Sequence, residues 1–277
     1  MMKIAVAGLG LIGGSLVRAF MNIENTVVYG FDLSEETMAR ARLEGAIHAE
    51  MTKDNIGECD YVFVALYPKA TEKFLREYAP LISKEATVID CGGTKKGICE
   101  IGFEMAQKYG FCFMGGHPMA GTHFSGFKYS RASLFQNASM ILVPKRNETI
   151  DKLQEVKSLL VNIGFKSVTI STAEEHDRII AYTSQLAHVV SNAYVKSPNA
   201  RVHKGFSAGS YRDLTRVAKL NPRMWAELFM ENKENIIFEI DNLTAELKKY
   251  SDAIKNDDMK TLEELLAEGT KIKESIG

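Results

Sequence analysis

The segment Gly115–Gly121 (GGHPMAG) presents one histidine, His117, among glycines, a proline and other small residues. Pro118 disfavours α geometry at His117 and keeps its backbone extended. We expect this histidine to follow a strand, at the carboxyl edge where open α/β sheets bind ligands. An imidazole that titrates near neutral pH suits the removal of a hydroxyl proton. A histidine that only packs in a core or a turn would show the same pattern.

Polar residues at helical spacing follow in the last third of the chain. Ser184 and His188 lie four residues apart, so they share one face of a helix. Asp213 and Arg216 lie three residues apart on a later segment, and Trp225 is on the helix after it. A solvated Asp–Arg pair is the usual outcome of such spacing. Each residue alone is weak support for a site, and it is their combination that indicates one.

The first predicted strand leads into a G-x-G-x-x-G sequence, Gly8-Leu9-Gly10-Leu11-Ile12-Gly13, which opens a helix. Such glycines permit a tight turn and let the backbone approach a pyrophosphate at the helix N-terminus. The second strand ends in Asp32, whose carboxylate suits the ribose hydroxyls of NAD and repels a 2′-phosphate. Since no Arg or Lys follows immediately, NAD is favoured over NADP. A Rossmann-like turn that binds nothing, with Asp32 as a helix cap, is the alternative.

Strand and helix patterns alternate over residues 1–171, which is typical of βαβ units and a mainly parallel sheet. We expect strands at Lys3–Ala7, Thr26–Phe31, Tyr61–Ala65, Thr87–Asp90, Phe111–Gly115, Ser139–Val143 and Ser167–Ile170. We expect amphipathic helices at Glu35–Glu44, Lys69–Leu81 and Ile150–Ile163. The predicted fold class is therefore α/β followed by all-α, with a Rossmann-type domain first.

The pattern changes near Ser171. Thr172-Ala173-Glu174-Glu175 has the Thr-x-x-Glu form of a capping box, and only helical periodicity follows it. We expect an NAD-binding domain at 1–171 and a helical substrate and dimerisation domain at 172–277. Asn221-Pro222 predicts a helix start, and Pro222–Tyr250 is expected to form one helix about 40 Å long. A helix of that length usually packs against a partner subunit, so we expect a homodimer.

Composition limits the classes of partner. The chain has 34 basic and 35 acidic side chains, so no global field attracts nucleic acid or an anionic membrane. No apolar stretch approaches the roughly 20 residues that span a bilayer, and glycines interrupt the first apolar run, unlike in a signal peptide. The four cysteines, Cys59, Cys91, Cys99 and Cys112, contain no C-x-x-C pair. We therefore expect reduced thiols, no bound metal and a cytoplasmic location.

In combination, these segments resemble the prephenate/arogenate dehydrogenase family over nearly the whole chain. The matching stretches, in order, are Gly8–Ser15, Gly116–Gly121 with Ser125-Gly126, His176–His188 and Gly209–Trp225. The resemblance implies a Rossmann domain, an all-helical dimerisation domain, and NAD-dependent oxidative decarboxylation of prephenate to 4-hydroxyphenylpyruvate in tyrosine biosynthesis. Arogenate, oxidised directly to tyrosine, is the alternative substrate. We expect the single-function form, without an appended chorismate mutase or ACT domain.

The resemblance also implies a role for each site residue. His117 corresponds to the catalytic histidine, which accepts the proton of the substrate's 4-hydroxyl. Arg216 corresponds to the arginine that binds the substrate's carboxylate, for which a guanidinium fork is well shaped. His188 corresponds to a second active-site histidine, and Ser184 corresponds to a polar residue of the pocket. Asp213 and Trp225 correspond to residues that shape the pocket.

Two positions depart from the family's pattern. Many members have Ser-Val-Lys after the fourth strand, and the serine touches substrate or nicotinamide. Gly93 stands at the serine's place here, so Thr94 or a backbone group of this cofactor-binding turn would have to substitute. His123 stands where a glutamate often follows Ala-Gly-Thr, close to a dianionic substrate. We expect an altered pH profile from His123, with activity retained.

Two other interpretations compete with this one. A Rossmann-plus-helical dehydrogenase of the β-hydroxyacid or pyrroline-carboxylate reductase kind would depend on a catalytic lysine or a different loop after the sheet, and the Gly-His-Pro motif argues against it. A non-catalytic NAD-sensing protein would belong to another class. Such a sensor has no need for His117, Ser184, His188 and Arg216 together.

Overall fold

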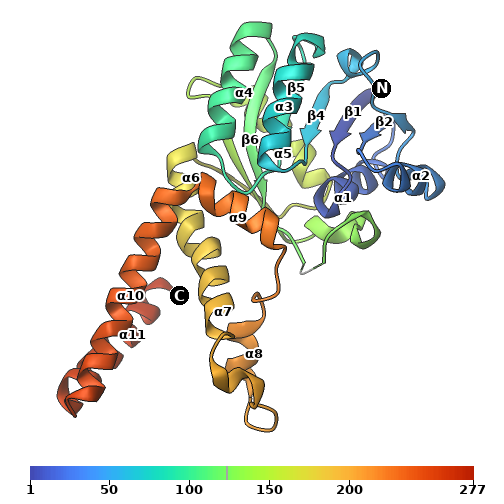
Figure 1. Cartoon of the computed structure of the whole chain (residues 1–277). Helices are drawn as coiled ribbons and strands as arrows, with labels where there is room; N and C mark the ends of the chain where they lie inside the picture. Colours follow the sequence, from blue (N-terminus) through green and yellow to red (C-terminus); the bar gives the residue numbers. More distant parts are fainter. Residues whose placement is uncertain (123) are drawn as a thin grey trace.

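The chain forms a sheet covered by helices and a second, helical part that extends away from it (Figure 1). The structure is a computed structural model, and it describes residues 1–122 and 124–277. The predicted fold class, an N-terminal Rossmann-type sheet followed by a C-terminal helical part, is confirmed.

The sheet has the strand order β3-β2-β1-β4-β5-β6-β7-β8, and all neighbours are parallel except β6 and β7. Its strands are β1 (Met2–Ala7), β2 (Thr26–Phe31), β3 (Ala49–Glu50), β4 (Tyr61–Val64), β5 (Thr87–Asp90), β6 (Cys112–Pro118), β7 (Ser139–Pro144) and β8 (Ser167–Ile170). Among the strands of residues 1–122 and 124–277, β3 is the one that the sequence patterns missed, because its two residues are too few to show alternation. The order reverses between β1 and β4, and ligands of open α/β sheets bind at such a switch point.

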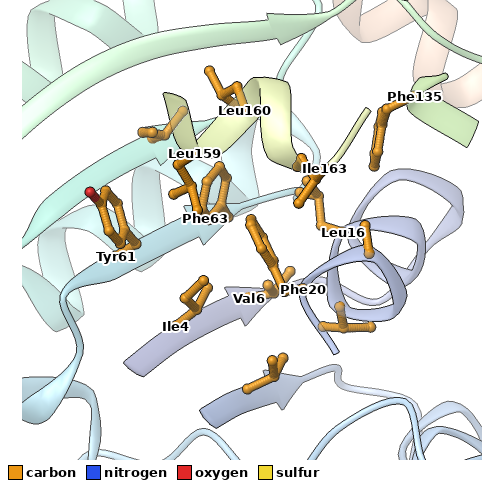
Figure 2. Packing of buried hydrophobic residues seen from close by; sticks show 14 of the residues in the cluster. Ile4, Val6, Leu16, Phe20, Tyr61, Phe63, Phe135, Leu159, Leu160 and Ile163 are labelled. Atoms are coloured by element: carbon orange, nitrogen blue, oxygen red, sulfur yellow. The ribbon is translucent and has the colours of Figure 1, made fainter. Parts of the chain in front are cut away.

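Both faces of the sheet are covered, and this explains why the central strands read as continuous apolar runs. Val6 of β1 packs with Phe63 and Phe20 in the cluster on one face (Figure 2), where the two phenyl centroids are 5.0 Å apart. Ala5 points to the other face and lies in a second cluster with Leu75. The helices of this part are α1 (Leu11–Phe20), α2 (Glu35–Leu43), α3 (Pro68–Tyr78), α4 (Lys96–Tyr109) and α5 (Ile150–Asn162).

The helical part begins directly after β8. It contains α6 (Ala173–Ile180), a π-helix η5 (Ala181–Leu186), α7 (Ala187–Tyr194), α8 (Gly209–Thr215), α9 (Pro222–Glu231), α10 (Lys233–Lys255) and α11 (Met259–Ile276). Short 3-10 turns lie at Ile56–Glu58, Ala79–Leu81, Phe127–Tyr129, Ala132–Phe135 and Pro198–Arg201. Both predicted helix starts are confirmed, since Thr172 caps α6 and Asn221 caps α9 through side-chain oxygens that accept backbone hydrogen bonds. Among the described residues, none of the helices is long and apolar enough to cross a membrane.

The prediction of one helix over Pro222–Tyr250 is wrong. The chain turns sharply between α9 and α10 (Figure 1), at Asn232, whose φ and ψ are −108° and 29°. Asn232 is buried, and its side-chain nitrogen donates to the carbonyl of Asp177 at 2.7 Å and to Oε1 of Gln185 at 2.8 Å. These two buried acceptors fix the turn at a position where helical periodicity alone predicts continuation.

Candidate active site

In the turn from β1 into α1, two positions accept no residue larger than glycine. Gly8 has a φ of +88°, and a Cβ there would lie 2.5 Å from the carbonyl oxygen of Ala65. A Cβ on Gly13 would lie 1.8 Å from the carbonyl oxygen of Gly8, so α1 can pack on the turn only through a glycine. At Gly10, by contrast, a Cβ would meet nothing within 4 Å. The turn therefore leaves open backbone at the N-terminus of α1. Of the three apolar residues between these glycines, Leu9 is buried and Leu11 and Ile12 are half-buried.

Asp32 is held against this turn. Its Oδ2 accepts a hydrogen bond from the backbone nitrogen of Leu9 at 2.8 Å, and its Oδ1 accepts one from Ser34 at 2.9 Å. The N-cap of α2 is Ser34, whose hydroxyl accepts from the backbone of Thr37. Ser34, and not Asp32, is therefore the residue that caps α2. The position of Asp32, directly after β2, suits contact with ribose hydroxyls.

His117 lies within the end of β6, where it pairs with Ile141 of β7. The predicted strand ended at Gly115, but β6 continues for three more residues to Pro118, so the prediction that His117 follows the strand is wrong. The strand continues because Pro118 keeps the backbone of His117 extended. The imidazole is directed to α6, and its Nδ1 is 2.9 Å from Nε2 of His176. Burial, followed by the neighbouring His176 and Lys95, holds the pKa of His117 well below its ordinary value. The ring is therefore neutral near pH 7.

A buried ion pair next to His117 was missed from the sequence. Lys95 and Asp90 are both fully buried, and the lysine Nζ is 2.5 Å from Oδ2 of the carboxylate. Asp90 also accepts from the backbone nitrogens of Gly92 at 2.8 Å and Gly116 at 3.0 Å. Such additional hydrogen bonds offset the desolvation of a buried pair. An acid at a strand end and a lysine five residues later gave no sign that both are buried.

The π-helix brings Ser184 and His188 together in an arrangement that sequence spacing predicted only in part. Nδ1 of His188 donates to the backbone carbonyl of Ser184 at 2.9 Å, so the contact does not use the serine hydroxyl. The imidazole stacks on the indole of Trp225 from α9, with ring centroids 3.8 Å apart. Nothing in the amino-acid pattern indicated a π-helix, although such turns are frequent at functional sites.

Arg216 lies close to this pair. Burial lowers the pKa of His188, and the positive charge of Arg216 lowers it further. Arg216 and Asp213 are both exposed, and no ion pair joins them or links either one to another charge in the described part of the chain. The alternative of a solvated Asp–Arg pair is therefore not what the structure shows.

A cavity of about 150 Å³ lies where the helical part meets the carboxyl edge of the sheet. It is lined by residues of the β5–α4 turn, α3, α4, α6 and α9, including Asp90, Thr94, Asp177 and Glu231. The hydroxyl of Thr94 donates to Glu231 across it at 2.5 Å. Burial raises the pKa of Glu231. The cavity thus lies between the two parts of the chain and next to the buried Asp90–Lys95 pair.

Gly93 faces α9, and a Cβ there would come within 3.2 Å of Cδ2 of Leu228. A side chain at position 93 would therefore require the end of the Leu228 side chain to shift by a few tenths of an ångström. The glycine that departs from the family's pattern thus stands in a tight contact with α9. His123, the other departure, lies outside the described residues.

A glycine turn at the switch point, a carboxylate beside it and a neutral histidine at the same edge define the class of dinucleotide-dependent oxidoreductases. Two family models match this chain. "Prephenate dehydrogenase, nucleotide-binding domain" matches residues 18–169, and "Prephenate dehydrogenase, dimerization domain" matches residues 172–268. The chain belongs to the prephenate dehydrogenase family.

Individual relatives agree. The chain is 31% identical to a prephenate dehydrogenase of Bacillus subtilis over 268 residues, 94% of this chain and 72% of that protein. It is 30% identical to a cyclohexadienyl dehydrogenase of Zymomonas mobilis over 278 residues, 97% of this chain and 94% of that protein. A crystal structure of the A. aeolicus prephenate dehydrogenase in complex with hydroxyphenyl propionate and NAD+ is similar with a TM-score of 0.86, at 27% identity and coverage of 100% and 99%.

Proposed function

We propose that this chain is an NAD-dependent prephenate dehydrogenase, which converts prephenate to 4-hydroxyphenylpyruvate in tyrosine biosynthesis. The observation that carries the proposal is the neutral, half-buried imidazole of His117 at the same sheet edge as the glycine turn. Family membership supports it. So does the similar A. aeolicus enzyme, whose complex holds NAD+ and hydroxyphenyl propionate.

The residues of the β1–α1 turn fit a dinucleotide. Because Gly8 and Gly13 exclude a Cβ, the backbone can approach a pyrophosphate closely. Asp32 is held beside the turn, where its carboxylate can bind the ribose hydroxyls. The backbone at Gly93 completes the cofactor site in place of a serine. When bound, NAD supplies the acceptor for the hydride of the substrate's ring carbon.

The chain's own residues position the substrate and move one proton. His117 takes the proton of the 4-hydroxyl, a role that requires its neutral form. Arg216 binds a carboxylate, for which its exposed guanidinium is available. His188, with Ser184 and Trp225, forms the wall beside Arg216. His123 and Asp213 stay as predictions from the sequence, the first as a substrate contact and the second as a residue that shapes the pocket.

We further propose that the chain divides at residues 171 and 172 and that it forms a homodimer through the helical part. Exposed apolar side chains along α10, including Phe238 at 62%, Leu247 at 60% and Ile254 at 61%, support a partner surface there. The match to a dimerization domain supports the same assembly. Four cysteines without disulfides support a cytoplasmic location.

The experiment that tests the function is NADH formation by the purified protein with NAD+ and either prephenate or L-arogenate, repeated with NADP+. Turnover of prephenate with NAD+ is the expected result. Turnover of L-arogenate alone would replace the substrate with the alternative one. NAD+ binding without turnover of either compound would overturn the proposal in favour of a non-catalytic sensor.

A further inference from the structure

A chain of three side chains leads from His117 into the helical part. Nδ1 of His117 is 2.9 Å from Nε2 of His176, and Nδ1 of His176 is 2.7 Å from Oδ1 of Asp177. His176 and Asp177 are both buried. The two imidazole rings come from different parts of the chain, β6 and α6, and their centroids are 5.1 Å apart.

The carboxylate end of this chain is fixed by backbone donors. Oδ1 of Asp177 accepts from the backbone nitrogen of Lys95 at 2.7 Å, and Oδ2 accepts from that of Lys96 at 2.9 Å. Both oxygens therefore act as acceptors, which leaves Asp177 no proton to offer to His176. The Nδ1 of His176 must be the donor in its contact with Asp177.

The direction of the hydrogen bond between His176 and His117 follows from this one. A neutral imidazole carries one proton, so a His176 that donates from Nδ1 can only accept at Nε2. His117 must then donate from its Nδ1, and its Nε2 is left with a free lone pair. We propose that His176 and Asp177 are positioning residues that hold His117 in the Nδ1–H tautomer, so that Nε2 is the atom that takes the substrate's proton. The assignment of that proton rests on the proposed function, but the tautomer does not.

The proton transfer is balanced at named atoms. The hydroxyl O–H bond of the substrate breaks as the Nε2–H bond of His117 forms, and His117 becomes an imidazolium. Its Nδ1–H remains hydrogen-bonded to His176, whose own N–H is directed at the Asp177 carboxylate. In serine proteases, an aspartate hydrogen-bonded to the catalytic histidine fixes the tautomer and the orientation of that ring. Here Asp177 would do the same for His117 through the ring of His176.

The same geometry predicts how acid stops the reaction. A protonated His176 would donate from Nε2, which reverses its hydrogen bond with His117 and moves the His117 proton to Nε2. The base is then lost even though His117 is still neutral. The other charged groups around the pair are Lys95 and Asp90 from the β5–α4 region, Asp177 on α6 and Glu231 on α9.

Two substitutions at one position separate the two contacts. His176→Gln places a carbonyl oxygen where Nε2 was, so it can still accept from His117. His176→Asn places an amide where Nδ1 was, so it keeps the contact with Asp177 and loses the one with His117. We expect His176→Asn to lower kcat by about 10- to 100-fold, part of the usual general-base contribution, with little change in KM. We expect His176→Gln to restore most of that loss and to move the acid limb of the kcat profile to lower pH.

The decisive measurement does not require turnover. In ¹⁵N-histidine-labelled full-length protein above the titration range of imidazole, we expect the His117 signal, assigned by its loss in His117→Asn, to show a protonated Nδ1 and an unprotonated Nε2. A protonated Nε2 would overturn the proposal, as would equal kcat and equal acid limbs in the wild type and both variants. If the expected tautomer is found but neither prephenate nor L-arogenate is oxidised, the proposed function fails while the positioning role stands. Thermal melting of each variant serves as the folding control.

Discussion

Oδ1 of Asp90 accepts a hydrogen bond from the backbone nitrogen of Gly116, the residue before His117, at 3.0 Å. The other oxygen of the same carboxylate holds the buried Lys95. One side chain at the end of β5 thus sets the position of the β6 residue next to the proposed base and neutralises the nearest ammonium group. We therefore expect both the stability of the fold and the position of His117 to depend on Asp90.

Asp90→Asn keeps the size of this side chain and removes its charge. We expect the free energy of unfolding to fall by about 3 kcal/mol, because the change leaves the Lys95 ammonium buried without a counter-charge. Urea denaturation measures the loss. Asp252→Asn, at an exposed pair with Lys248, is the control and should leave stability unchanged. An unchanged midpoint for Asp90→Asn would contradict a stabilising role for the buried Asp90–Lys95 pair.

Asp32→Ala should erode the preference for NAD+ over NADP+, because the carboxylate that repels a 2′-phosphate is gone. The ratio of kcat/KM for the two cofactors measures this. Glu35→Ala, at an exposed residue in the first turn of α2, controls for the general loss of negative charge. If the ratio moves as far in Glu35→Ala as in Asp32→Ala, the direct role of Asp32 is wrong.

His117→Asn should lower kcat by about 10²–10⁴-fold, the usual contribution of a general base. NAD+ affinity should stay within about twofold, because the glycine turn follows β1 and Asp32 follows β2, whereas His117 lies in β6. Steady-state kinetics and a NAD+ titration on the same sample separate the two effects. A parallel loss of NAD+ binding would point to a collapsed site and remove the support for a base.

Arg216→Ala should mainly raise KM for the substrate, because a carboxylate contact is made in the ground state as well as in the transition state. Arg212 is also exposed and lies one turn earlier, within α8, so Arg212→Ala is a matched control that should leave KM unchanged. A fall in kcat alone for Arg216→Ala would contradict the binding role.

The two half-buried histidines His117 and His188 should make the fold sensitive to acid. Burial holds the pKa values of His117 and His188 below their ordinary value in the folded chain. The unfolded chain then binds more protons below pH ~6.5, so unfolding becomes easier as the pH falls through that value. We expect the denaturant midpoint to drop between about pH 7.5 and 5.5, and to drop less in His117→Asn. A denaturant midpoint of the wild type that rises on acidification would contradict this prediction.

The sheet and the cofactor turn could be predicted from the sequence because their signals are local. Strands buried on both faces are continuous apolar runs, and the glycines of the turn are required by the close approach of their own neighbours, as Gly13 and Gly8 show. His117 was found in the same way, from the proline and glycines beside it. The helix caps at Thr172 and Asn221 were likewise readable within four residues.

What the sequence could not predict depends on contacts between distant residues. His176 and Asp177 were visible as neighbours at the start of a helix, but only the fold brings them to His117. The break at Asn232 is fixed by two acceptors, one on α6 and one on the π-helix, and helical periodicity contains no trace of them. The stack of His188 from α7 on Trp225 from α9 likewise joins residues that are distant in the sequence.

The close contact between Gly93 and Leu228 links two positions through the volume that they share. A side chain at position 93 would require Leu228 to move or to become smaller, because its Cδ2 already lies 3.2 Å from where a Cβ would be. During the divergence of related chains, a serine could be gained at 93 most readily after a smaller residue had appeared at 228. The order of the two replacements matters, so these positions should change together along a lineage, although one lies in the nucleotide-binding half and the other in the helical half.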